Sequence, residues 1–194
     1  MFEQYLASTP IIDWKHSLIL GLSRKLFNQA DSPLGLARLS FEWVRDNIRH
    51  SSDYRLNPVT CTASDVLSAR TGFCFAKSHL LAAVLRANGI PAGICYQRLR
   101  YDDEGFRYTL HGLNAVYLPE TGWYRIDPRG DGQGISTCFN PPMEFLAFPA
   151  DKQGEAMLPE IWPEPLPVVV EVLRASDTYE QVLENLPDLE LIIG

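Results

Sequence analysis

One long segment rich in alanine and leucine restricts the fold of this chain more than any other feature. Residues 74–88 read CFAKSHLLAAVLRAN, and small or apolar side chains recur on one side of it at helical spacing. The segment stops at Asn88-Gly89, with Pro91 beyond, a combination that typically ends a helix. We therefore predict a central, mostly buried helix against which the remainder of the chain packs.

Three strand-like runs follow this helix directly. They cover residues 92–100, 106–118 and 123–127, and the short turns Asp102–Gly105 and Pro119–Gly122 separate them. Turns of this length join antiparallel neighbours. The sequence therefore predicts that the helix is followed by an antiparallel sheet.

Two amphipathic helices are predicted before the central one, over residues 16–28 and 33–48. Ser32 is the expected cap of the second, with Pro33 at its first position. The apolar stripe expected to face a core there consists of Leu36, Leu39, Trp43 and Val44. Residues 50–61 are polar and predict a loop, and Ser64 is the expected cap of a short helix over 65–69.

The last third of the chain, from Pro128 onward, is rich in glycine and proline and predicts a wrapping loop. A helical pattern resumes at 179–186, with Ser176 or Asp177 as its cap, and at 168–173, which could equally be a strand. No internal repeat or low-complexity segment interrupts the chain. We expect one domain over residues 1–194, with a core at about 30–130 and a wrapping C-terminal segment at 131–194.

The charge pattern excludes several kinds of partner. The net charge is -7 and no run of lysine and arginine offsets it, so we expect no nucleic-acid partner. No stretch approaches the roughly 18 to 20 uncharged apolar residues that cross a bilayer, so no membrane association is expected. The first residues carry early charges and do not resemble a secretory signal. We expect a soluble, cytoplasmic protein.

The four cysteines do not form a metal-binding pattern. Cys61, Cys74, Cys95 and Cys138 are far apart in the sequence and include no CxxC pair. A structural zinc site is therefore not expected, and no metal or other cofactor is predicted. In a reducing compartment the four side chains would be free thiols.

Cys74 is the cysteine with an activating position. It falls in the first turn of the central helix, where unpaired backbone N–H groups and the positive end of the helix dipole stabilise a thiolate. Gly72, two residues earlier, would let the chain turn sharply and let a substrate backbone approach. Cys95 lies in mid-strand, and Cys61 and Cys138 lie in predicted loops. We interpret Cys74 as a nucleophile.

His111 is the best candidate for the base that a thiol nucleophile needs. It lies within a predicted strand, and Gly112 beside it leaves room for another backbone. His79 is five residues after Cys74 on the same helix, roughly 140° around its axis, and is interpreted as packing or hydrogen bonding. His50 and Asp53 could form a second acid–base pair, but a solvated loop is the preferred interpretation.

Asp127 can orient the base. It ends the next strand, and if the turn pairs Leu118 with Gly122, then Leu113 lies opposite Asp127 and His111 is its diagonal neighbour on the same face. A carboxylate in that place accepts a hydrogen bond from the second ring nitrogen of the histidine. A register slip of one residue would move Asp127 to the other face.

These residues resemble the transglutaminase-like superfamily, in which Cys, His and Asp occur in this order on a helix and two following strands. The matching stretches are Gly72–Cys74 with the helix to Arg86, Asn88–Ala92, Leu110–Ala115 and Gly122–Pro128. The resemblance implies an α+β fold with a papain-like transglutaminase core, in which the nucleophile helix packs on an antiparallel sheet. The chain is most similar to small bacterial members described as transglutaminase-like proteins or cysteine proteases. The family's common His-Ala-Trp is here His111-Gly112-Leu113, so no role of that tryptophan is carried over.

The resemblance also implies the chemistry. Cys74 as nucleophile, His111 as base and Asp127 as orienting acid would transfer or hydrolyse the acyl group of a peptide or protein amide through a thioester. The backbone N–H of Cys74 would be one oxyanion donor, with Tyr54 and Gln97 as candidates for the second. The alternative function is a catalytically silent domain of the same fold that binds a peptide or partner.

Overall fold

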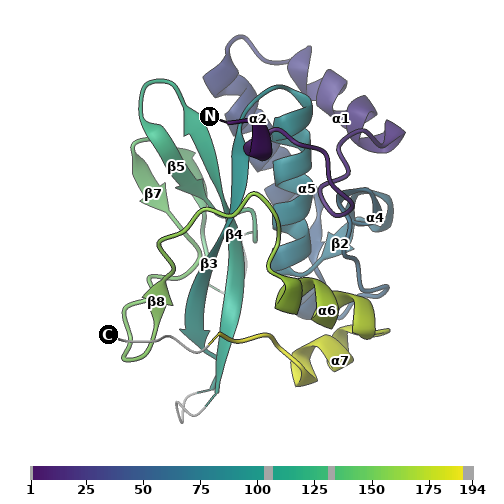
Figure 1. Cartoon of the computed structure of the whole chain (residues 1–194), viewed down its shortest axis with the longest axis vertical. Coiled ribbons are helices and arrows are strands. Elements are labelled where there is room, and N and C mark those ends of the chain that lie inside the picture. The colour runs from purple at the N-terminus through teal and green to yellow at the C-terminus, as the bar shows by residue number, and fades with distance from the viewer. Residues whose placement is uncertain (1, 103–106, 131–133, 190–194) are drawn as a thin grey trace.

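A computed structural model describes residues 2–102, 107–130 and 134–189. The predicted central helix is α5 (Cys74–Ala87), and every side chain from Cys74 to Arg86 in it is buried. It ends at Asn88, and Gly89 follows with a φ of +74°, a left-handed conformation that glycine adopts without a steric cost. Figure 1 shows α5 between the sheet and the N-terminal helices. The prediction of a central buried helix is confirmed.

The sheet next to α5 has the strand order β5-β4-β3-β8. Its strands are β3 (Ala92–Arg100), β4 (Tyr108–Leu118), β5 (Gly122–Ile126) and the short β8 (Ala156–Met157), and all neighbours are antiparallel. β4 and β5 pair with Leu118 opposite Gly122, which is the predicted register. Residues 103–106, which include the start of the second predicted strand and most of the predicted Asp102–Gly105 turn, lie outside the described residues.

The two faces of the sheet are covered by different parts of the chain. Ile94 and Val116 belong to the main core with α5, whereas Cys95, Leu113 and Ala115 form a second apolar cluster against partly buried side chains of the C-terminal third. This alternation follows from the period of two along a strand. The α+β arrangement of a helix packed on an antiparallel sheet is therefore confirmed.

Gly112 sets the distance between α5 and β4. A Cβ atom at this position would lie 2.9 Å from Cδ1 and 3.0 Å from Cα of Phe75, the second residue of α5. A backbone atom cannot move aside as a flexible side chain can. The helix N-terminus therefore approaches the strand closely only because residue 112 has no side chain, as the sequence indicated.

We expect Gly112→Ala to lower the free energy of unfolding by about 1–3 kcal/mol, because the added methyl group overpacks the contact with the Phe75 backbone. Denaturant unfolding measures this change. Gly21→Ala is the matched control, since nothing lies within 4 Å of a Cβ there and the site is inside helix α1 (Ser17–Phe27). The control should be stabilised by roughly 0.5–1 kcal/mol, and equal effects at both positions would contradict the account.

The predicted helices before α5 are confirmed as α1 and α2 (Pro33–Asn47), the latter with Ser32 as its cap. Its buried face differs from the predicted stripe, because Leu39 and Trp43 are only partly buried. The residues that form this face are Leu36, Ala37, Ser40, Phe41 and Val44. The short helix α4 (Ala63–Ala69) is capped by Thr62 and not by Ser64, since Thr62 and Asp65 form a reciprocal capping box.

The predicted loop over 50–61 contains regular structure. β1 (Arg49–His50) pairs in parallel with β2 (Thr71–Gly72), and a one-turn helix, α3 (Ser51–Tyr54), follows it. Gly72 is part of this pair, and a Cβ there would meet Thr60 Oγ1 at 3.1 Å. The absence of a side chain at Gly72 therefore permits close packing of the chain here.

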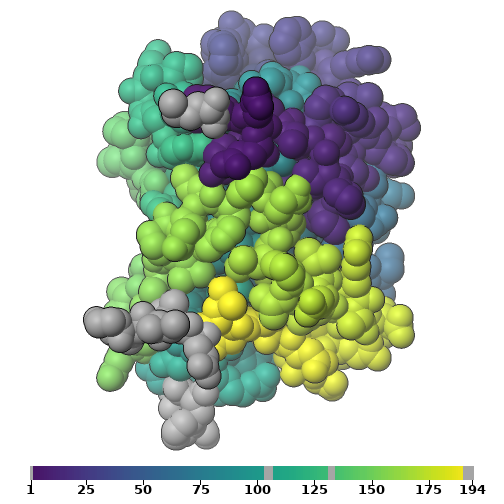
Figure 2. Space-filling view, in the orientation of Figure 1, coloured from purple at the N-terminus to yellow at the C-terminus, as the bar shows by residue number. Residues whose placement is uncertain are grey.

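The C-terminal third wraps around the sheet and α5. Its elements are β6 (Cys138–Asn140), β7 (Met143–Phe145), β8, α6 (Pro167–Ala175) and α7 (Tyr179–Glu184). Figure 2 shows its green and yellow residues covering much of one face of the molecule. The ambiguous segment at 168–173 is helical, and Thr178 caps α7 in place of the predicted Ser176 or Asp177. A short 3-10 helix, Glu3–Tyr5, opens the chain.

Two contacts fix the end of this segment to the sheet. The backbone N–H of Leu110 in β4 donates to the carbonyl oxygen of Pro187 at 2.7 Å. The Arg98 guanidinium of β3 makes two hydrogen bonds of 2.7 Å to the Asp188 carboxylate. Such a bidentate pair holds its partners in one orientation. The segment after α7 is therefore held beside the part of β4 that carries His111.

In the described ranges, the structure contains no helix of the length and apolar character needed to cross a membrane. Among the same residues, no three His, Cys, Asp or Glu side chains are grouped as metal ligands. All four cysteines are free, as predicted, and only Cys138 among them is exposed.

Candidate active site

Cys74 is the first residue of α5. Its N-cap residue, Phe73, has no side chain that could satisfy the first backbone N–H groups of the helix. The Sγ atom accepts a hydrogen bond from the backbone N–H of Gly112 at 3.5 Å. The sulfur therefore lies at the positive end of a helix dipole and against β4, in the position that the sequence predicted.

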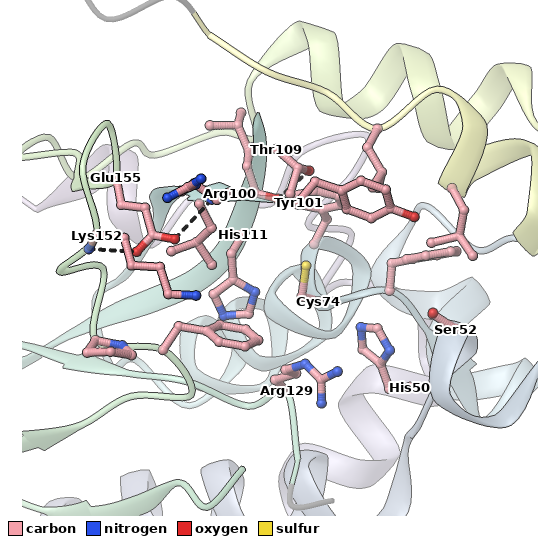
Figure 3. A pocket seen from close by; sticks show the side chains of 18 of the residues that line it. His50, Ser52, Cys74, Arg100, Tyr101, Thr109, His111, Arg129, Lys152 and Glu155 are labelled. Atoms are coloured by element: carbon pink, nitrogen blue, oxygen red, sulfur yellow. Dashed lines mark hydrogen bonds between the residues drawn. The ribbon is translucent and has the colours of Figure 1, made fainter. Parts of the chain in front are cut away.

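His111 and Asp127 are in direct contact. Nε2 of His111 lies 2.7 Å from Oδ2 of Asp127, and both side chains are buried. The Asp127 carboxylate also accepts backbone N–H bonds of 3.0 Å from Arg129 and Ala147. Because its oxygens are held in this way, the carboxylate fixes the imidazole with Nε2 toward Asp127. Nδ1 is left for the sulfur, and Figure 3 shows the imidazole and the Cys74 thiol side by side.

Cys74 and His111 shift each other's pKa. Burial alone would raise the pKa of the Cys74 thiol, but the neighbouring His111 imidazolium outweighs this effect and lowers the pKa to about 6. Burial would lower the pKa of His111, but the charges of Asp127 and Cys74 raise it to about 10. At neutral pH the two side chains therefore form a thiolate–imidazolium pair. Burial alone would raise the pKa of the Asp127 carboxyl group. The charge of His111 and the two backbone N–H groups outweigh this effect and bring the pKa below its ordinary value.

The pKa values of the other two buried thiols are raised and not lowered. Burial raises the pKa of Cys95 to about 12, although Arg125 acts against it. Burial also raises the pKa of Cys61. Since the thiolate is the reactive form, these two thiols are poor nucleophiles at neutral pH.

A pocket of about 320 Å³ opens onto Cys74 and His111. Its apolar wall combines aromatic residues next to the nucleophile with side chains from β4 and the C-terminal segment: Phe73, Phe75, Leu110, Phe148, Leu183 and Leu186. Phe148 also packs edge-on against the His111 ring, with centroids 5.0 Å apart. Charged residues line the rest, among them Arg100, Lys152 and Glu155 (Figure 3).

His50 is a residue of the pocket whose setting sequence reasoning misjudged. It was expected in a solvated loop, yet only 8% of it is exposed, and it lines the pocket together with Cys74. Its Nδ1 lies 3.5 Å from Oδ1 of Asp53, and the same oxygen accepts a hydrogen bond of 2.9 Å from Arg129. The interpretation as a solvated loop is wrong, because pairing of β1 with β2 draws His50 into the molecule. The i, i+3 spacing of His50 and Asp53 was the available signal.

Arg129 lies at the edge of the site, two residues after Asp127. It lines the pocket and bonds to Asp53, so it connects the Asp127 loop to α3.

Neither predicted candidate for the second oxyanion donor has a suitable position. Tyr54 is 56% exposed, and Nε2 of Gln97 donates to the carbonyl oxygen of Phe148 at 2.9 Å. Both are absent from the pocket lining that the described residues form. His79 has the predicted packing role, since it is buried with Nδ1 2.8 Å from the carbonyl oxygen of Cys61. Burial lowers the pKa of His79 to about 4, so this ring is neutral.

Lys77 links the segments that carry the site by hydrogen bonds. Its side chain is fully buried one helical turn after Cys74, and Nζ donates to the backbone carbonyl oxygens of Arg45, Ile48 and Arg129. Burial lowers the pKa of this ammonium to about 7, with the charge of Asp127 acting in the opposite direction. The lysine therefore joins α5 to the end of α2 and to the loop that follows Asp127.

A family model and a curated relative both match part of this chain. Residues 21–128 match the family model described as the Transglutaminase-like superfamily core. A protein-glutamine gamma-glutamyltransferase of Pseudomonas aeruginosa is 31% identical over 111 residues, which are 48% of this chain and 17% of that protein. The chain thus spans about a sixth of the length of this relative.

One solved structure shows the same fold. A protein of Cytophaga hutchinsonii, provisionally described as a cysteine protease, matches with a TM-score of 0.55 and 19% identity over 66% of this chain and 42% of its own. The periplasmic domain of TgpA from Pseudomonas aeruginosa matches with a TM-score of 0.45 and 25% identity over 57% of this chain and 41% of its own. The family match covers more than half of the chain, and it includes Cys74, His111 and Asp127. This chain therefore belongs to the transglutaminase-like superfamily.

Proposed function

We propose that this protein is an enzyme that transfers or hydrolyses the acyl group of an amide through a thioester on Cys74. The observation that carries the proposal is the buried group of three side chains. A thiol at a helix N-terminus shares a pocket with an imidazole that a buried carboxylate holds at 2.7 Å. Such a group activates a nucleophile, and a module that only binds a partner has no need of all three.

The steps follow from the ion pair. The Cys74 thiolate attacks the amide carbonyl carbon, and the oxygen that becomes negative accepts a hydrogen bond from the Cys74 backbone N–H at the start of α5. His111 then gives its proton to the leaving nitrogen, and a thioester forms. The neutral imidazole next takes a proton from water or from an amine, which attacks the thioester and releases Cys74. Asp127 keeps the ring in one orientation throughout.

The proposed substrate is a peptide or protein amide. The pocket next to Cys74 has an apolar wall, so an acyl group with an apolar portion would bury surface there. Leu183 and Leu186 of this wall lie beyond residues 21–128, the part that matches the family. The C-terminal segment would therefore select the substrate, while the family core supplies the chemistry.

A panel of amides and activated esters tests the proposal. The purified protein is incubated with each compound, with and without an added primary amine, and both products and protein are followed by mass spectrometry. We expect an acyl adduct on Cys74, an acid product in water, and an amide product if amine transfer is the reaction. The proposal fails if no compound of the panel acylates Cys74.

A further inference from the structure

The sulfur of Cys74 has a second histidine beside it. Figure 3 shows Cys74 between the rings of His111 and His50, so that His50 occupies the side of the sulfur away from the base. Both histidines line the pocket, and both are nearly buried. The three steps of the proposed reaction assign no role to His50.

The ring of His50 is held by its surroundings. The β1–β2 pairing sets His50 opposite Gly72, two residues before the nucleophile. The ring packs edge-on against Phe73 with centroids 5.7 Å apart. Phe73 and Gly72 are covalently continuous with Cys74, so movement of the His50 ring relative to the sulfur is restricted.

Asp53 determines which nitrogen of His50 faces the pocket. Its Oδ1 lies 3.5 Å from Nδ1 of His50, and it is fixed by the hydrogen bond from Arg129. The contacts with His50 and Arg129 outweigh burial and lower the pKa of Asp53 to about 2, so the group is a carboxylate at any working pH. With Nδ1 next to this carboxylate, Nε2 is directed toward Cys74 (Figure 3).

We propose that His50 supplies the second oxyanion donor, with its Nε2–H directed at the acyl oxygen while Cys74 attacks. This role rests on the proposed acyl transfer. As the S–C bond forms, the π electrons of the carbonyl move to oxygen, which accepts hydrogen bonds from the Cys74 backbone N–H and from His50. When the carbonyl re-forms, the C–N bond breaks and the leaving nitrogen takes its proton from His111, so His50 keeps its own proton.

The positions of the other groups favour this assignment over a second base. His111 already has the carboxylate partner and the ion pair with the sulfur that a base requires. The attacking water or amine enters where the leaving nitrogen departed, which is beside His111. The carbonyl oxygen must then lie toward the other side of the sulfur, where His50 is. Among the described residues Nδ1 of His50 makes no hydrogen bond that would hold the ring proton there, since Oδ1 of Asp53 is 3.5 Å away, so the proton can reside on Nε2.

Two reactions of the same sulfur separate this role from a structural one. Alkylation by iodoacetamide needs a thiolate but forms no oxyanion, whereas acylation by an activated ester needs both. We expect His50→Ala to lower the acylation rate by about 10²–10³-fold, with little change in the alkylation rate above the titration range of the thiol. His50→Gln keeps an N–H donor, so its acylation rate should be at least about tenfold higher than that of His50→Ala.

His16→Ala is the matched control, because it makes the same change at an exposed histidine that caps α1. Thermal unfolding shows whether each variant is folded. If His50→Ala is not folded, the rates of His50→Gln and the wild-type protein are compared in its place. Acylation at the wild-type rate in His50→Ala, or equal losses of acylation and alkylation, would overturn the role of His50 alone. A wild-type protein that no activated ester acylates would overturn the proposed function, and this role with it.

Discussion

Replacing Cys74 with alanine is expected to lower the rate of acyl transfer on the order of 10⁴-fold or more, as removal of a nucleophile does in other covalent enzymes. The other residues of the pocket can still bind and polarise an amide, but no thioester can form. The effect should fall on kcat and leave substrate binding largely unchanged, since the sulfur occupies little of the pocket surface. Steady-state kinetics with a reactive compound from the substrate panel measure it.

Cys138→Ala is the control for this variant, because Cys138 is the exposed free thiol and lies on β6, outside the pocket lining of the described residues. It should retain full activity. The same loss in both variants would point to general damage, and an active Cys74→Ala protein would remove the thioester from the mechanism.

His111→Ala is expected to lower the rate on the order of 10³-fold, within the range for a general acid–base group. Two effects combine in this variant. The leaving nitrogen loses its proton donor, and Cys74 loses the positive charge that stabilises its thiolate against burial. Single-turnover kinetics with an activated ester and with an amide distinguish them, because the amide depends far more on protonation of its leaving group.

The ester should therefore lose less activity than the amide in His111→Ala. A variant that cleaves both at wild-type rates would show that another group is the base. Thermal unfolding is the control for folding, since removal of the ring leaves the buried Asp127 carboxylate with its two backbone donors but without its imidazole partner.

The three central residues could be predicted from sequence because strong local patterns carry each of them. Cys74 begins the most regular helical segment, His111 lies on β4, and Asp127 directly follows β5, which a short turn joins to β4. The pairing of Leu118 with Gly122 was enough to make His111 and Asp127 neighbours, and the structure has that register.

The surroundings of these residues could not be predicted in the same way. His50 becomes buried only through a two-residue pairing between β1 and β2, which are more than 20 residues apart and carry no periodic pattern. Lys77 is buried, although a lysine normally faces solvent, because two carbonyl oxygens from the end of α2 and one from the loop after Asp127 converge on it. The helix caps at Thr62 and Thr178 were misplaced by one or two residues, since several neighbouring side chains could cap equally well.

The rate of Cys74 alkylation as a function of pH is the most direct test of the account. The rate constant at Cys74 is followed with iodoacetamide by peptide mass spectrometry. A pKa lowered to about 6 means that the thiolate forms as pH rises through 6, and a His111 pKa raised to about 10 means that its imidazolium partner persists to about pH 10. We predict a rise with a midpoint near pH 6 and a plateau through neutral pH. A midpoint at about 8.5, as for an ordinary thiol, would contradict the thiolate–imidazolium pair on which the proposed chemistry depends.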